Sequence, residues 1–499
     1  MKKILLLISL IACSLSAVSC LEEDSSAIVN PYDFFKTSVQ IRGAVNGCYG
    51  PLVDIHDLRY FIAVEGTTDL ASTNGSAQKD AKLDINPASN GAGTHVWQKC
   101  WFGIRYCLST IAGIGRSPLA DSEKSHFDVE TRILMSYYYY LLTSFFGDVP
   151  FYTDYVETDA DLILIGNKGR MSAFETRKAL IEDLKLHVPT LPQMRTCDQE
   201  LNNCGAAMGW MMIAKLAAWN KDWDTVIEAG EHLEAIYGDL KQYPYTDVMF
   251  RNKNTPESIF EILHEWEEGG IEFATANGLS IHTVVLPYPK TAGTNIYDGV
   301  TIPELGTEAQ AYTPLRPTSY MKTTVCPSGK GDIRREINMC SGWDGVNFGS
   351  NRVWMGPKFW SPGTYKYYDN MNYKVFRYAD AVLLLAEAWC EKGDYAKSIE
   401  YLNMVRDRAE IDPYHFVTQV KLRGEIRDER GRELFGEFGR KYDLVRWGIW
   451  YEQVSAYNLY SNVQANILPC HEYYPIPDVQ CARSGRVLSN PEYEKYGLK

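Results

Sequence analysis

Few residues in this chain have the types and spacing for catalytic chemistry. His264 and Glu265 begin the H-E-x-x-H pattern of a zinc helix, but Glu268 occupies the position of the second histidine. Two carboxylate pairs, Glu65 with Asp69 and Glu265 with Glu267, have a spacing that glycoside hydrolysis could use. In a chain with 63 acidic residues such pairs arise readily by chance. The sequence also lacks a G-x-S-x-G elbow and a G-K-[ST] phosphate loop, so we do not expect an enzyme.

Metal chemistry is not indicated either. None of the twelve cysteines forms a C-x-x-C pair, and no Cys/His cluster has zinc spacing, so we expect neither a metal nor a cofactor. Cys326 with Cys340, and Cys470 with Cys481, could close disulfide loops in an exported protein. Free buried thiols are an equal alternative for these four residues.

Residues suited to binding are more abundant. The chain has 33 tyrosines and 12 tryptophans, whose rings can pack in a core or stack on sugar rings. Residues 54–90 form a long polar stretch in which small hydroxyl and amide side chains surround Asp69, as a site for sugar hydroxyls would require; a plain surface loop is the alternative. Residues 256–372 are rich in Gly and Pro with aromatic residues between them. The ligand-binding candidates from these two stretches are Asp69, Asn74, Trp266, Tyr288, Tyr297 and Trp343.

Helices must position these loops. Apolar residues recur at three- and four-residue steps over about 32–58, 94–147, 172–237 and 376–410. Two of these stretches predict helix pairs, with short turns at Lys221-Asp222-Trp223 and Gly393-Asp394-Tyr395. Paired helices of this kind resemble tetratricopeptide repeats, and about four pairs are expected. The fold class is therefore mostly α, with a loop-rich insertion that contains short strands at about 256–372.

The N-terminus has the pattern of a secretion signal. Lys2 and Lys3 precede an apolar stretch, and Ala17-Val18-Ser19-Cys20 has the small residues of a cleavage site. Cys20 resembles the lipidated cysteine of a lipobox. We expect residues 1–19 to be a signal peptide and residues 20–30 a lipidated cysteine and flexible tether; an ordinary signal peptide is the alternative.

The net charge and the hydropathy of the chain restrict the kinds of partner that it can bind. The formal net charge of −13 argues against a nucleic-acid partner, because phosphate binding requires a basic face. No later apolar stretch is long enough to span a bilayer. The acidic tract Leu21-Glu22-Glu23-Asp24 resembles an export tag that directs lipoproteins to the outer face of the outer membrane.

Residues 423–450 carry the most specific motif. The order E-R-x-x-E-L-x-x-E-x-x-R-x-x-D-L-x-R-W-G, from Glu429 to Gly448, resembles the C-terminal signature of the SusD/RagB family. Further resemblances are the G-D-V-P at 147–150, the F-R-Y-A-D at 376–380 and the Y-P-I-P at 474–477. Five signature residues are expected to be structural: Arg430, Glu433, Asp443, Arg446 and Trp447.

The resemblance implies a single SusD-like body over 31–499, anchored by its lipid at the outer-membrane surface. It also implies that the protein binds a glycan and delivers it to a SusC-like TonB-dependent transporter, which it covers as a lid. The alternative is a tetratricopeptide-type scaffold or a peptide-binding lipoprotein of an envelope complex.

Overall fold

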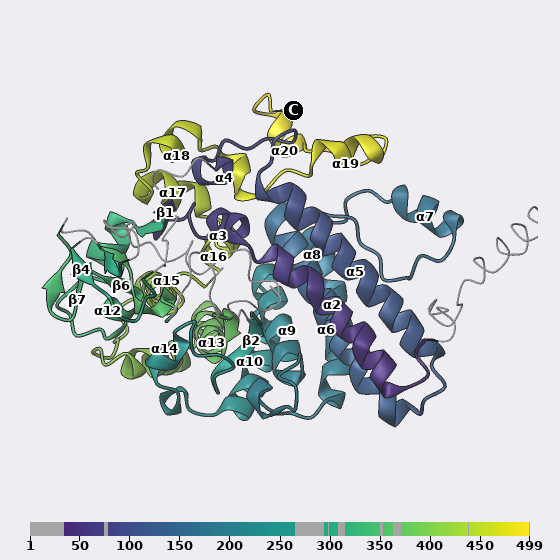
Figure 1. Cartoon of the computed structure of the whole chain (residues 1–499), viewed down its shortest axis with the longest axis horizontal. Helices are drawn as coiled ribbons and strands as arrows, with labels where there is room; N and C mark the ends of the chain where they lie inside the picture. Colours follow the sequence, from purple (N-terminus) through teal and green to yellow (C-terminus); the bar gives the residue numbers. More distant parts are fainter. Residues whose placement is uncertain are drawn as a thin grey trace, which may run out of the picture.

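The computed structural model of this chain describes residues 34–73, 78–264, 294–297, 299–307, 315–349, 353–362, 371–437 and 439–498. The protein is mostly helical, as the apolar periodicity predicts. The longer helices extend from the right side of the molecule across its lower middle, and β4, β6 and β7 lie at the left end (Figure 1). No helix in these described ranges is long and apolar enough to cross a membrane.

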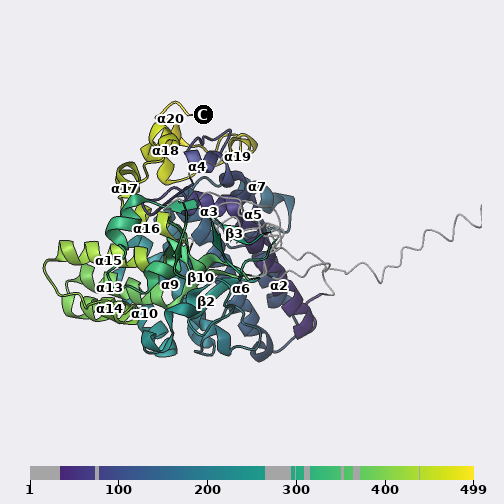
Figure 2. The same ribbon diagram turned by 60° about the vertical axis from the view of Figure 1, so that its left-hand side comes forward.

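The longer helices form an array in which neighbours in chain order pack together. α2 contacts α5, α5 contacts α6, and the contacts continue through α8, α9 and α10 to α13. Figure 2 shows α13, α14 and α15 side by side, with α10 next to them. The bounds are α2 Ser38–Ile55, α5 Ala92–Arg116, α6 Asp121–Phe146, α8 Ala173–His187, α9 Ala206–Asn220, α10 Trp223–Tyr237, α13 Tyr378–Lys392, α14 Tyr395–Arg408 and α15 Gln419–Glu433.

Both predicted helix pairs are present, and their turns use the same chemistry. The first helix of each pair ends at a left-handed residue, Lys221 with φ 57° or Gly393 with φ 84°. The next residue is an aspartate that caps the second helix: Asp222 accepts a hydrogen bond from the Thr225 amide and Asp394 from the Lys397 amide. The tetratricopeptide character of the pairs remains a prediction.

Helix α6 carries the run of four tyrosines. Because four consecutive residues on a helix point in all directions, this run requires contacts around the whole helix. Tyr137 to Tyr140 are all buried. The Tyr138 hydroxyl donates to the Cys48 carbonyl at 2.6 Å, and its ring lies against Gly103 of α5, where even a Cβ would overlap it. Along this run α6 is therefore enclosed on all sides.

Within the described residues, the strands form five antiparallel two-stranded pairs. The pairs are β1 Ala71–Thr73 with β5 Leu315–Pro317, β2 Ser258–Ile262 with β10 Tyr373–Arg377, β3 Ile296–Tyr297 with β4 Val300–Thr301, β6 Met339–Cys340 with β9 Trp354–Met355, and β7 Gly342–Trp343 with β8 Val346–Asn347. Between them lies the short helix α12 Arg334–Asn338.

Shorter helices connect and close the body. They are α3 Leu58–Val64, α4 Lys79–Lys82, α7 Asp159–Gly166, α16 Arg440–Arg446, α17 Trp450–Tyr457, α18 Ser461–Asn466, α19 Asp478–Arg483 and α20 Pro491–Glu494. Single 3-10 turns lie at Val188–Thr190, Thr196–Asp198, Leu240–Gln242, Tyr245–Val248, Pro357–Phe359 and Pro469–Glu472, and a π turn at Met321–Val325.

Residues 54–90 differ from the expected polar surface loop. They contain α3, whose residues Tyr60 to Val64 are buried, and the following Thr67 and Thr68 are buried as well. The hydroxyl of Thr67 donates to the Ala63 carbonyl and that of Thr68 to the Glu65 carbonyl, so backbone groups satisfy them inside the body. In this structure Cys326, Cys340, Cys470 and Cys481 are free thiols.

Candidate functional site

The signature segment builds a network of buried charges rather than an open site. Arg377, at the end of β10, donates to Glu257 at 2.8 Å, to Glu433 at 2.5 Å and to Glu437 at 2.8 Å. Arg408 of α14 pairs with Glu257 at 2.9 Å and also contacts Glu433. These side chains are almost fully buried, so the guanidinium groups and carboxylates neutralise one another without water.

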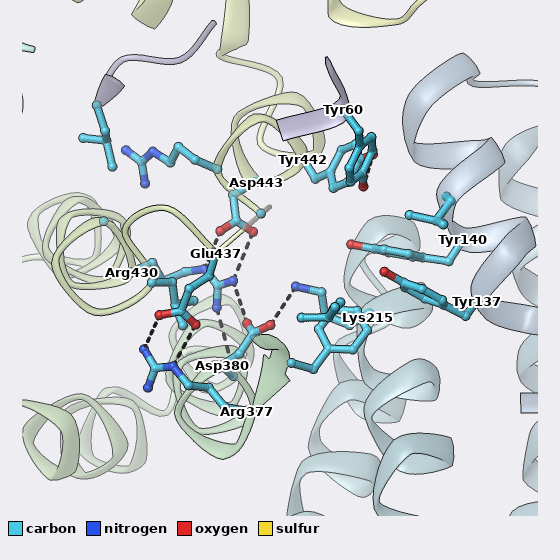
Figure 3. A pocket seen from close by; sticks show the side chains of 18 residues that line it. Tyr60, Tyr137, Tyr140, Lys215, Arg377, Asp380, Arg430, Glu437, Tyr442 and Asp443 are labelled. Atoms are coloured by element: carbon cyan, nitrogen blue, oxygen red, sulfur yellow. Dashed lines mark hydrogen bonds and ion pairs between the residues drawn. The ribbon is translucent and has the colours of Figure 1, made fainter. Parts of the chain in front are cut away.

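A second part of the network joins α9, α13, α15 and α16. Asp380 accepts from Arg430 at 2.7 Å and from Lys215 at 2.9 Å, and Arg430 also reaches Asp443 at 2.8 Å (Figure 3). Arg446 makes two 2.6 Å hydrogen bonds to the carboxylate of Glu387 on α13. These ion pairs fix the positions of four helices, α9, α13, α15 and α16, relative to one another.

The cavity among these residues is too small for a nutrient. Its volume is about 30 Å³, close to the share of a single water molecule. Burial alone would raise the pKa of Glu429, but Arg334, Arg432 and Arg406 outweigh it and hold this pKa at about 2. Arg430, Glu433, Asp443 and Arg446 are buried and paired, and the Trp447 indole donates to Glu387. Their predicted structural role is confirmed.

The expectation that Asp69 faces a ligand is wrong. Asp69 is 0% exposed, and Arg440 donates to both carboxylate oxygens, at 2.9 and 2.7 Å. Glu65, the other member of the carboxylate pair in the sequence, is also buried; its Oε1 accepts from the amides of Gly439 and Arg440. Both side chains fasten the signature segment to the N-terminal half of the chain. A substrate on the surface reaches neither of them.

Glu65 should make stability depend on pH in an unusual direction. Burial raises its pKa to about 8 against the pull of the Arg440 and Gly439 amides, so the folded state holds a proton that the unfolded state releases above about pH 4.5. Stability from this group is present at low pH and falls as the pH rises from about 4.5 to 8, by roughly 1 kcal/mol per unit. The variant Glu65→Gln should remove this slope, which urea unfolding at several pH values measures.

The matched control is Glu231→Gln, an exposed residue of α10. Subtracting each variant's unfolding free energy from that of the native chain isolates the contribution of the single carboxylate. A Glu65→Gln difference that stays flat between pH 5 and 8 would contradict a protonated buried glutamate.

Among the remaining candidates, Tyr297 is buried. It lies in the β3–β4 hairpin with an exposed fraction of 0%, and burial raises its pKa to about 12. Its ring is therefore not available for stacking on a surface ligand, which corrects the expectation. Asn74, Trp266 and Tyr288 lie outside the described residues.

Trp343 is half-buried at the tip of a small hairpin. Asp344 with φ 48° and Gly345 with φ 77° form the two-residue turn between β7 and β8, and Asp-Gly readily adopts these left-handed angles. The Trp343 ring rests on the buried ring of Trp360, with centroids 4.7 Å apart. The Trp360 indole donates to the Met355 carbonyl at 3.2 Å, so the supporting ring is itself held.

Several exposed residues lie on the two hairpins at this end of the molecule. β4 packs beside β7, which brings the β3–β4 hairpin next to Trp343. Figure 1 shows β4 and β7 at the end of the molecule farthest from α2 and α5. The exposed residues on these two hairpins mix apolar surface with hydroxyl, amide and carboxylate groups. We call this set the Trp343 platform: Ile296, Thr301, Trp343, Asp344, Val346 and Asn347.

Two larger hollows lie elsewhere on the body. One of about 340 Å³ opens between α2 and β2, with Leu201 and Leu263 on its rim. The other, of about 330 Å³, opens beside the end of α6 and is walled by Tyr473, Tyr493 and Tyr496. Their sizes suit small ligands. Sequence reasoning missed both, because their walls come from segments far apart in the chain; the tyrosine-rich N-P-E-Y-E-K-Y at 490–496 was the only signal for the second.

The fold and the site define a class of protein: a helical scaffold, locked by buried ion pairs, that carries an aromatic platform on short hairpins. Residues 344–493 match the model of the SusD family. In this part the chain is similar to the SusD family.

Known proteins extend this similarity over most of the chain. SusD-like proteins P25 and P2 of Formosa agariphila are each 24% identical to it, over 95% and 98% of both chains respectively. A SusD superfamily protein from Bacteroides vulgatus superposes with a TM-score of 0.71 at 18% identity, over 91% of this chain and 99% of that one. Surface glycan-binding protein A from Bacteroides thetaiotaomicron, solved in complex with laminarihexaose, superposes with a TM-score of 0.70 at 19% identity, over 91% of this chain and 99% of that one.

Proposed function

We propose that this protein is a cell-surface lipoprotein that captures an oligosaccharide or polysaccharide and delivers it to a SusC-like TonB-dependent transporter. The Trp343 platform is the observation that carries the glycan-binding part. A half-exposed indole seated on a rigid buried one offers a π face to the C–H face of a sugar ring. Asp344 and Asn347 beside it supply acceptors and donors for sugar hydroxyls.

Binding at such a platform is passive and weak at each contact. Stacking contributes about 0.5–1.5 kcal/mol per ring, by analogy with aromatic pairs. With a few hydrogen bonds in addition, dissociation constants should lie in the micromolar to millimolar range. Relatives named for glycans, including a laminarin-binding SusD-like protein of the same fold, support a carbohydrate ligand.

Trp343→Ala should weaken glycan binding by about 3- to 10-fold, because it removes the stacking face and leaves the hairpin turn intact. Isothermal titration against a panel of polysaccharides and oligosaccharides, laminarihexaose among them, measures this change. The matched control is Tyr106→Ala, which removes a 42% exposed aromatic ring from α5, outside the platform.

Two outcomes would count against the proposal. Binding that survives Trp343→Ala unchanged would place the glycan elsewhere on the molecule. No binding to any glycan of the panel would favour the alternative, a tetratricopeptide-type scaffold or a peptide-binding lipoprotein. Co-purification tests the transporter part separately, since a lid should bring down a large outer-membrane barrel protein and a bare scaffold should not.

A further inference from the structure

Helix α7, Asp159–Gly166, leaves several large apolar side chains exposed to solvent. None of its residues is buried, and Leu162, Ile163 and Leu164 are 61%, 64% and 66% exposed. Figure 1 shows α7 standing apart from the packed helices. Three adjacent aliphatic side chains in water are costly, and exposed apolar groups of this kind mark an interaction surface.

The helix is nevertheless well formed. Thr158 caps it: its hydroxyl oxygen accepts from the Asp161 amide at 3.2 Å, and the Asp161 carboxylate accepts from the Thr158 amide at 3.0 Å. The arm that carries α7 is closed at its base by an antiparallel bridge between Val149 and Met171. The structure therefore presents this apolar turn at the end of a closed arm.

The distribution of the apolar residues indicates what surrounds them. Successive residues of a helix are about 100° apart, so Leu162 to Leu164 with the partly exposed Ile165 spread around most of the helix. A helix that docks on a protein usually has one apolar face, whereas a helix that is apolar on most sides suits an apolar medium that encloses it. The acidic residues Asp159 and Asp161 lie at one end, in the first turn.

The position of the arm indicates which apolar medium surrounds α7. Ser117, at the end of α5, donates to the Phe35 carbonyl at 2.6 Å, and the Phe35 ring lies against Gly113. The neighbouring Arg116 pairs with Glu157, two residues before α7 begins. The point where the described chain starts and the segment just before α7 therefore lie at the same end of α5.

We infer that α7 inserts Leu162, Ile163 and Leu164 into the surface of the lipid bilayer as a second attachment beside the lipid anchor. This inference rests on the proposed lipidation of Cys20. Thirteen residues lie between Cys20 and Phe34, and the 14 Cα–Cα steps span at most about 50 Å, so the anchor keeps this end of the body close to the membrane. Figure 1 shows β4 and β7, whose hairpins carry the Trp343 platform, at the opposite end of the molecule from α7.

An environment-sensitive fluorophore on α7 tests the contact. The full chain carrying Ile163→Cys is purified with its lipid, labelled with a nitrobenzoxadiazole dye, and reconstituted alone into phosphatidylethanolamine/phosphatidylglycerol vesicles. We expect a blue-shifted emission and at least a threefold stronger quenching by spin-labelled lipid than for the matched variant Val420→Cys on α15, where the exposed fraction is 73%. The unsubstituted chain, labelled in parallel, gives the background from half-buried Cys197 and Cys470.

The outcomes separate the inference from the function on which it rests. Fatty-acid incorporation that disappears in Cys20→Ala establishes the anchor independently. If the chain is lipidated but the dye at position 163 behaves like the dye at position 420, the membrane contact is overturned while the anchor stands. A dye signal that arises only when a barrel protein is added would also overturn the membrane contact and assign α7 to that protein. If no fatty acid is incorporated, the anchor and the membrane contact fail together. Glycan titration of the same samples reports on the platform in every case.

Discussion

Replacing Arg377 with methionine is expected to lower the free energy of unfolding by about 3–5 kcal/mol. Arg377 is 1% exposed and contacts three carboxylates, those of Glu257, Glu433 and Glu437. Methionine fills much of the same space but leaves these groups without the cation that lies between them. Buried carboxylates that lose a partner must be protonated or hydrated, and each alternative destabilises the fold.

Urea unfolding followed by circular dichroism measures this loss. The matched control is Arg486→Met, which breaks a surface pair with Asp478 whose side chains are 64% and 40% exposed. Water and salt screen such an exposed pair, so its loss should change the free energy of unfolding little. A loss below 1 kcal/mol for Arg377→Met would show that the buried network is not what holds β10, α14 and α15 together.

Acid should unfold the native chain over a narrow range of pH. Burial would raise the pKa values of Glu429, Glu433 and Asp443, but the surrounding guanidinium groups hold that of Glu429 at about 2 and the other two well below their usual range. The unfolded state therefore takes up protons first. The stability that these groups contribute is complete above about pH 4.5 and is lost as the pH falls from 4.5 through 2.

The expected size follows from the shift of Glu429 alone. A decrease of about 2.5 pKa units corresponds to roughly 3 kcal/mol, and typical proteins are stable by only about 5–15 kcal/mol. In the Glu65→Gln background, which lacks the opposite trend of that residue, urea titrations at pH 7, 4.5, 3.5 and 2.5 should show a midpoint that is nearly constant at first and then decreases steeply. With Glu429→Gln added, the low-pH slope should be shallower. A midpoint in the Glu65→Gln background that is unchanged at pH 2.5 would refute the electrostatic account.

Local sequence patterns predict the helical frame well. The spacing of apolar residues placed the helices of the array, and the turns at Lys221-Asp222 and Gly393-Asp394 marked two helix pairs. Turns and caps depend on neighbouring residues, so a window of a dozen residues contains the information they need. The Asp344-Gly345 turn carried a hairpin signal of the same local kind, which would have placed Trp343 at a hairpin tip.

The candidate site was harder to predict because exposure is not a local property. Asp69 has the surroundings of a sugar-binding residue in the sequence, yet its carboxylate is bound by Arg440, 371 residues later. Tyr297 sits in a loop-rich segment and is buried all the same. Trp343 is the one candidate among the described residues whose ring is only half-buried. Its supporting ring, Trp360, follows β9, a different strand from the one that carries Trp343.

The amino-acid sequence by itself determined the helical frame, the charged signature and the absence of a recognisable catalytic motif. Only the tertiary structure decided which polar and aromatic residues remain free to meet a ligand. The physical reason is that periodicity and capping act between neighbours along the chain, whereas burial and ion pairing depend on groups brought together from distant segments.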